Sequence, residues 1–167
     1  MKIAIDSCSI ILLAKATVLE ALSNKYNLFI PEKVYEEILK GKDKNFIDAL
    51  LTERLVKEKK INIKKVLNNI LKKKMIQDFN LGIGEAETLA LVMENQCEAI
   101  ITDNKQGRKS AAIYGLDLVG SIDAVIALYK LHLIDKDKTI DGLKKLREFG
   151  WFQDYLIDNA LEEVKNE

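Results

Sequence analysis

Five acidic residues stand where a parallel sheet would bring them together. Asp6 and Asp103 each come directly after a short apolar run that predicts a strand. Glu85 and Glu87 begin the helix that leads into the strand before Asp103, and Glu37 lies on the edge of the apolar stripe of an earlier helix. Because open parallel sheets bind ligands beyond the carboxyl ends of their strands, we expect these side chains to approach one sheet edge.

Carboxylates that meet in this way need protons or cations. Two of them about 4 Å apart repel each other by roughly 4 kcal/mol at an effective dielectric constant near 20. Because no histidine or thiolate accompanies them, a cluster of oxygen ligands favours Mg²⁺ or Mn²⁺ over Zn²⁺. Two such ions, about 3.5–4 Å apart, activate water and stabilise the leaving oxygen in phosphodiester cleavage. The acids therefore predict a Mg²⁺ or Mn²⁺ site for phosphate chemistry.

Each acid taken alone has a simpler explanation. An aspartate after a strand commonly caps the next helix, which would account for Asp6. Glutamates in a first helical turn interact favourably with the helix dipole, which would account for Glu85 and Glu87. Glu37 alone fits a solvated charge. The coincidence of all these acids at one sheet edge is what favours a functional site.

The elements that position the acids follow an alternating pattern. The chain has 167 residues, 48% of them hydrophobic and 31% charged, which suits one globular domain with its own core. Strands alternating with helices predict a three-layer α/β/α fold with a mainly parallel sheet. The expected strands are 2–5, 27–30, 99–102 and 116–119, and the expected helices are 10–16, one from Thr17, 31–40, 85–95, 107–114, 121–131, 139–149 and 153–164.

A helical insertion is expected between the second strand and the acidic helix. Residues 46–55 and 63–79 have helical spacing and predict two antiparallel helices over the sheet, with an edge strand at 56–61 between them. Thr17 with Glu20 forms the pattern of a capping box, and Ser121 is a good N-cap. We expect one domain over residues 1–167, with an α/β core to about 133 and C-terminal helices over 134–167.

The cysteines and the hydropathy limit the class of protein. Cys8 and Cys97 lie in apolar contexts and predict reduced core residues rather than a disulfide or a zinc pair. The only histidine, His132, is remote in sequence, which argues against Cys–His catalysis. No apolar run approaches the ~20 residues of a membrane span, and no secretory cleavage site follows the start, so we expect a cytoplasmic protein.

Charge is balanced overall but unevenly distributed. The net charge is zero, with a basic stretch between Arg54 and Lys74 and an acidic stretch from Glu148 to Glu167. Two interpretations of the basic stretch stay open: a solvated helix face, or a flank that holds a phosphate backbone. The basic residues are Arg54, Lys57, Lys59, Lys60, Lys64, Lys65, Lys72, Lys73 and Lys74.

Four short motifs occur in order along the chain, namely Asp6-Ser7, Pro31-x-x-Val34-x-x-Glu37, Gly84-Glu85-Ala86-Glu87 and Thr102-Asp103. In this order the chain resembles the PIN-domain family of compact metal-dependent ribonucleases, whose active-site layout is related to that of flap endonucleases. The similarity covers about residues 2–125, and Gly107-Arg108 with Phe149-Gly150-Trp151 resembles an uncharacterised subgroup from archaea and bacteria.

The resemblance implies roles for the acids and their neighbours. Asp6, Glu37, Glu85, Glu87 and Asp103 would hold Mg²⁺ or Mn²⁺ and orient the attacking water, with either Glu85 or Glu87 as the main ligand. The single acid at Asp103, followed by an amide, leaves a second metal open. The implied substrate contacts are Ser7 and Thr102, which otherwise cap helices, and Lys105, Arg108 and Lys109, which otherwise are solvated.

The resemblance also implies partners, which are single-stranded RNA, an antitoxin protein that neutralises a toxin, and a second copy in a homodimer. Trp151, Phe152 and Tyr155 suit either an interface or the core. The alternative function is a PIN fold without activity that serves as a binding or scaffold module. An aspartyl-phosphate phosphatase is disfavoured because Cys8 occupies the position of its second aspartate, and a receiver-like phosphoacceptor lacks its lysine after residue 119.

Overall fold

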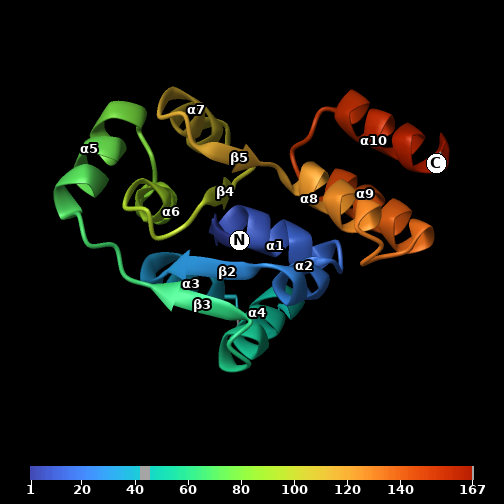
Figure 1. Cartoon of the computed structure of the whole chain (residues 1–167), viewed down its shortest axis with the longest axis horizontal. Coiled ribbons are helices and arrows are strands. Elements are labelled where there is room, and N and C mark those ends of the chain that lie inside the picture. The colour runs from blue at the N-terminus through green and yellow to red at the C-terminus, as the bar shows by residue number, and fades with distance from the viewer. Residues whose placement is uncertain (42–45, 167) are drawn as a thin grey trace.

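The fold is built on one parallel sheet. In the computed structural model, which describes residues 1–41 and 46–166, five parallel strands lie side by side in the order β3-β2-β1-β4-β5 (Figure 1). Their short runs of apolar residues suit strands that are covered on both faces. The strands are β1 (Lys2–Ile5), β2 (Asn27–Pro31), β3 (Ile61–Lys64), β4 (Ala99–Ile101) and β5 (Asp117–Val119).

The winding direction of the sheet reverses at β1. The chain builds β2 and β3 on one side of β1 and then crosses to place β4 and β5 on the other side. Ile3 of β1 pairs with Leu28 of β2 and with Ala99 of β4, so β1 is the central strand. The carboxyl ends of β1 and β4 therefore form the switch point at which open parallel sheets bind ligands.

Alternating residues of the strands face two separate core layers. Ile3 and Ile5 point into one apolar cluster, and Ala4 points into the other. The first layer is built by α1 (Ser7–Lys15), α2 (Leu19–Lys25), α3 (Glu32–Leu39), α4 (Ile47–Lys57), α8 (Ser121–Lys130), α9 (Lys136–Phe149) and α10 (Asp154–Asn166). The second is built by α5 (Asn69–Phe79), α6 (Ile83–Met93) and α7 (Lys105–Ile113). The predicted three-layer α/β/α fold is confirmed.

The insertion contains the first predicted helix, as α4, and an edge strand, but the boundaries and the helix packing differ from the prediction. Residues 56–61 are not the edge strand, because α4 continues to Lys57 and the strand begins only at Ile61. Helix α5 begins at Asn69 rather than at 63, because the Asn68 side chain accepts a hydrogen bond from the Leu71 amide and caps the helix there. The two helices also do not pack as an antiparallel pair, since β3 separates them and they contribute to opposite core layers.

Two predicted helix caps are also wrong. Thr17 has a left-handed backbone (φ 61°), and α2 is capped at Val18 without a side-chain hydrogen bond, while Glu20 instead accepts from Arg54. Ser121 is the first residue of α8 rather than its cap. The cap of α8 is Gly120, whose amide donates to Asp123 over 3.1 Å.

The C-terminal helices join the core of the α/β part. Leu143 and Leu146 of α9 and Ile157 of α10 are fully buried in the same cluster as Ile3 and Ile5. Figure 1 shows α9 and α10 at one end of the molecule, beside α8. Glu167, the last acid of the tail, lies outside the described residues. Within the described part of the chain, no single helix is long and apolar enough to cross a membrane.

Candidate active site

Asp6 is the buried centre of the carboxyl edge. It follows β1 and caps α1, where its Oδ1 accepts a hydrogen bond from the Ser9 amide over 2.8 Å. Its Oδ2 accepts a second hydrogen bond from the hydroxyl of Thr102, the residue that follows β4. The side chain is only 2% exposed. Asp6 therefore joins the two strands of the switch point while it also performs the helix-capping role that its position predicts.

The burial of Asp6 is not compensated by a positive charge. Desolvation raises the pKa of this carboxyl from 3.8 to about 6 against the opposing effect of its hydrogen bonds from Thr102 and Ser9, and the charge of Asp103 adds to the rise. No basic side chain in the described residues forms an ion pair with Asp6 or Asp103. A buried carboxylate without a cationic partner is costly, so this one is suited to binding a cation.

Asp103 is held at the same edge by hydroxyls and an amide. Its Oδ1 accepts from the Ser121 amide over 2.9 Å, and its Oδ2 accepts from the Ser9 hydroxyl over 2.9 Å and from the Ser121 hydroxyl. Ser9 and Ser121 are fully buried and were not among the predicted site residues. Each lies in the first turn of the helix that follows β1 or β5, which is a common place for serine, so the sequence alone did not mark either of them as a site residue.

Glu37 reaches the edge from α3. Its Oε2 accepts a hydrogen bond from the Ser7 hydroxyl over 3.0 Å, which places it beside the residue that follows Asp6. Gly84 of α6 closes its other side, because a Cβ there would stand 2.9 Å from the same Oε2. The start of α6 can approach the carboxylate this closely only because residue 84 is a glycine. Glu37 is therefore half-buried between three elements rather than a freely solvated charge.

The two glutamates of α6 have different partners. The Glu85 carboxylate accepts from the Gly82 amide over 2.9 Å and so closes the first turn of its own helix. The Glu87 carboxylate instead pairs with Lys72 of α5 at 3.0 Å. The pKa of Lys33 is raised mainly by its hydrogen bond to Glu36, with further contributions from the charges of Glu37 and Glu87. Glu87 therefore lies on the side of α6 that faces Lys72 of α5 and Lys33 of α3.

The thiol of Cys8 lies within reach of three acidic charges. Desolvation raises the pKa of its thiol to about 11, and the charges of Asp6, Asp103 and Glu85 add to the rise. Such a thiol is protonated near neutral pH, which agrees with the argument against cysteine catalysis. The prediction that Cys8 is a core residue is wrong, because it is exposed on the first turn of α1; Cys97 is buried as predicted. The charge of Glu85 thus reaches Cys8 together with those of the two aspartates, whereas the charge of Glu87 acts on Lys33.

The acids approach one another without closing a complete ligand set. Within residues 1–41 and 46–166, no group of three acidic, histidine or cysteine side chains stands close enough to hold a metal ion. The observed arrangement is instead a row of carboxylates along one sheet edge, each held by a hydroxyl or an amide of the chain. The donor chemistry is all oxygen, which matches the preference of Mg²⁺ and Mn²⁺.

Comparison with known proteins shows the family of the chain. The family model for DUF3368, described as a PIN domain, matches residues 2–166 of the chain. The chain belongs to the PIN-domain family. PIN domains are generally nucleases, and they typically use divalent metal ions. No curated protein and no solved structure matches the chain.

The predicted substrate contacts of this PIN domain fall into two groups. Ser7 and Thr102 cap no helix, because their hydroxyls donate to Glu37 and Asp6, and Asn104 caps α7. Among the cations after Asp103, Lys105 and Lys109 are exposed on α7. Arg108 turns back toward the site, where its Nη1 donates to the Thr102 carbonyl oxygen over 3.3 Å.

The basic stretch of this PIN domain is divided by ion pairs. Arg54 and Lys60 pair with Glu20 and Glu58 on the surface, which accounts for the first half of the stretch without a ligand. Lys72 pairs with Glu87 beside the acidic helix. The exposed lysines that form no ion pair with a described carboxylate are Lys59, Lys64, Lys65, Lys73 and Lys74.

Proposed function

We propose that this PIN domain is a Mg²⁺- or Mn²⁺-dependent endoribonuclease that hydrolyses phosphodiester bonds in single-stranded RNA. The observation that carries the proposal is the Asp6 carboxylate, which is 2% exposed, lacks a basic partner among the described residues, and lies beside Asp103 at the switch point of the sheet. No basic side chain of the described fold compensates a charge on this buried acid, whereas a metal ion bound at the switch point would.

The residues that would hold the ion are Asp6, Glu37, Glu85 and Asp103, with Glu87 as a further candidate on the Lys72 side. When bound, the ion supplies an activated water and stabilises the leaving oxygen of the phosphodiester. The chain itself keeps the carboxylates in place: the hydroxyls of Thr102, Ser9 and Ser7 donate to Asp6, Asp103 and Glu37 respectively. With a pKa of about 6, Asp6 is ionised at pH 7 and above, where it can bind a cation.

The cations of α7 are suited to the phosphate backbone. Lys105 and Lys109 project from the helix that follows Asp103, and Arg108 stands between the Thr102 carbonyl and Gly120. Contacts of this kind position an RNA strand without selecting its sequence. We therefore propose that these three residues orient the substrate, while the carboxylates take part in the hydrolysis.

The test is metal-dependent cleavage by the purified full chain. We expect Mn²⁺ or Mg²⁺ to permit cleavage of unstructured RNA and to raise the melting temperature, and we expect Asp6→Asn to lose both effects while it stays folded. Glu37→Gln and Glu36→Gln form a matched pair, because Glu36 is exposed and bound to Lys33. Only Glu37→Gln should impair cleavage. A wild-type protein that is inert on varied RNAs and shows no metal-dependent change in melting temperature would favour the inactive binding module instead.

The toxin role requires a separate measurement. Family resemblance suggests that the RNase acts on cellular RNA and is neutralised by an antitoxin protein. We expect induction of the wild-type chain to arrest bacterial growth, whereas Asp6→Asn should leave growth unchanged. Arrest by both proteins, or by neither, would contradict the toxin role. The nuclease proposal would still be tested by the cleavage assay with purified protein.

A further inference from the structure

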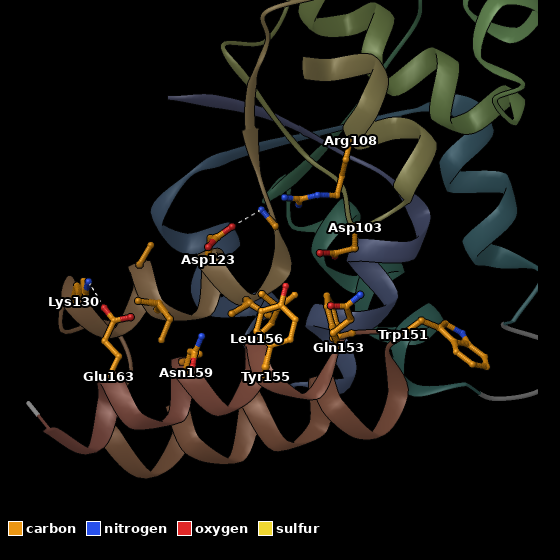
Figure 2. A pocket seen from close by; sticks show the side chains of 16 residues that line it. Asp103, Arg108, Asp123, Lys130, Trp151, Gln153, Tyr155, Leu156, Asn159 and Glu163 are labelled. Atoms are coloured by element: carbon orange, nitrogen blue, oxygen red, sulfur yellow. Dashed lines mark hydrogen bonds and ion pairs between the residues drawn. The ribbon is translucent and has the colours of Figure 1, made fainter. Parts of the chain in front are cut away.

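A groove runs from the acidic edge along the C-terminal helices. It lies between α8 and α10, has a volume of about 810 Å³, and includes Asp103 and Arg108 in its lining (Figure 2). Ligand pockets for small organic groups commonly measure about 300–1,000 Å³. The groove is therefore large enough for an organic group and opens directly onto a residue of the candidate active site.

The groove exists because α10 presents one face to the core and a second, mixed face to α8. One face buries Ile157, Leu161 and Val164 in the core. The other carries Tyr155, Asn159 and Glu163, which follow one another at four-residue spacing and therefore share one side of the helix. This second face looks across to α8 (Figure 2). The apolar residues that line the groove are Ile122, Ile126, Ala127, Phe152, Leu156 and Ala160.

Two aromatic rings of the groove are open to solvent. Trp151 is 104% exposed at one end of the groove, and Tyr155 is 58% exposed between the two helices. Figure 2 shows the Tyr155 ring pointing from α10 toward the end that holds Asp103, with Gln153 beside it. Tyrosine and tryptophan left exposed beside a cavity are typical of binding surfaces, because each combines a large apolar ring with a polar group.

The lining favours an uncharged, partly apolar occupant inside the groove and, at its mouth, a group that Arg108 can bind beside the carboxylates of Asp103 and Asp123. Within the groove, Glu163 pairs with Lys130, and Asp123 accepts from the Gly120 amide. The Arg108 guanidinium lies at the mouth, beside Gly120 and Asp103. The amides of Gln153 and Asn159 offer hydrogen bonds along the lining. A nucleobase attached to a phosphate matches this distribution.

We propose that the α8–α10 groove holds a nucleobase of single-stranded RNA, one that lies next to the phosphate at the carboxylate site. The inference rests on the proposed nuclease function, since the groove shares Asp103 with that site. Single-stranded RNA is bound largely by stacking its bases on aromatic side chains and arginine planes. Tyr155 supplies the stacking ring, Trp151 extends the stacking surface at the end of the groove, and Arg108 lies where the adjoining phosphate would pass.

The chain contains its own reporter for the test, because Trp151 is its only tryptophan. Titration of the full chain in EDTA measures binding without metal-dependent cleavage. We expect a single-stranded oligoribonucleotide to quench the fluorescence of Trp151 in a saturable manner. An abasic ribose-phosphate oligomer of equal length and an RNA duplex should bind more weakly and quench little. Equal quenching by the abasic oligomer would overturn the inference.

A matched pair of variants tests the ring that carries the inference. We expect Tyr155→Ala to weaken oligoribonucleotide binding at least fivefold and to raise KM with kcat little changed, because stacking contributes equally before and during the reaction. Tyr155→Phe keeps the ring and should restore binding. Phe149→Ala removes a ring that is 44% exposed but does not line the groove, so its affinity should equal that of the wild type.

The outcomes separate this inference from the nuclease proposal. Quenching by single strands without any cleavage in Mn²⁺ would support the groove and contradict the nuclease. Metal-dependent cleavage without quenching, and with Tyr155→Ala fully active, would support the nuclease proposal and overturn the proposal that the groove holds a nucleobase. If sedimentation shows a dimer that Tyr155→Ala dissociates, and RNA affinity is unchanged, the groove is an interface between copies of the chain and the inference fails.

Discussion

Gly84 of α6 packs directly against the carboxylate of Glu37 on α3. A Cβ added to Gly84 would lie 2.9 Å from Glu37 Oε2, 3.2 Å from Oε1 and 3.2 Å from Val34 Cγ2. Carbon and oxygen atoms do not pack this closely, so any larger residue must displace Glu37. The glycine before Glu85 is therefore a requirement of the site as well as of the helix start, and it ties the second acidic position to the third.

Gly84→Ala should impair the proposed nuclease activity without unfolding the protein. Alanine favours a helix by up to about 1 kcal/mol over glycine, which offsets part of the strain that the new Cβ causes. We expect a loss of activity of about tenfold to a hundredfold, because small displacements of catalytic groups have effects of this size. Gly82→Ala is the control, since its Cβ would make an ordinary contact of 3.6 Å with Glu85. Equal activity of the two variants would contradict the role of Gly84.

Asp6 should make the metal-free protein less stable as pH rises. Its carboxyl has a pKa of about 6 in the folded chain against 3.8 ordinarily, so the folded state holds the proton more tightly. Its contribution to stability is fully present below about pH 4 and is lost as pH rises through 6. The difference corresponds to about 3 kcal/mol. Urea unfolding in EDTA at pH 4 and pH 8 should show that Asp6→Asn abolishes this part of the pH dependence. An unchanged pH dependence in the variant would contradict the assignment.

Much of this fold follows from local patterns in the sequence. The runs before Asp6 and Asp103 are apolar and short, which suits strands covered on both faces, and the structure has β1 and β4 there. The insertion was harder to predict because residues 56–64 carry both helical and strand-like spacing. Asn68, whose side chain caps α5, decides where the helix begins, and that preference is local but weak compared with the apolar pattern.

The site itself was only partly visible in the sequence. Asp6, Glu37 and Asp103 could be proposed because each follows or faces a predicted strand end. Ser9 and Ser121 could not, because their roles depend on how α1 and α8 meet at Asp103, a contact between residues far apart in the chain. Serines in a first helical turn are common, so residue type alone does not distinguish a positioning hydroxyl from an ordinary one.

Glu85 and Glu87 should differ in their response to metal. The charge of Glu85 reaches Cys8 together with those of the two aspartates, whereas Glu87 is paired with Lys72. We expect Glu85→Gln to reduce the rise in melting temperature that Mn²⁺ causes, and Glu87→Gln to keep it while lowering stability by about 1 kcal/mol through loss of the ion pair. Thermal unfolding with and without Mn²⁺ measures both effects. A loss of the metal response in Glu87→Gln alone would reverse the assignment.

Thr102 should control how readily Asp6 becomes a carboxylate. Its hydroxyl donates to Asp6 Oδ2 and lowers the pKa that burial raises. Thr102→Val keeps the shape and removes the donor, so we expect a still higher pKa for Asp6 and a destabilisation of about 1–3 kcal/mol at pH 8, where the buried charge has lost a partner. The acidic limb of the pH profile of kcat/KM should move to higher pH. Thr102→Ser keeps the hydroxyl and should restore the wild-type profile. If the valine and serine variants move the profile equally, the effect comes from packing rather than from the hydrogen bond.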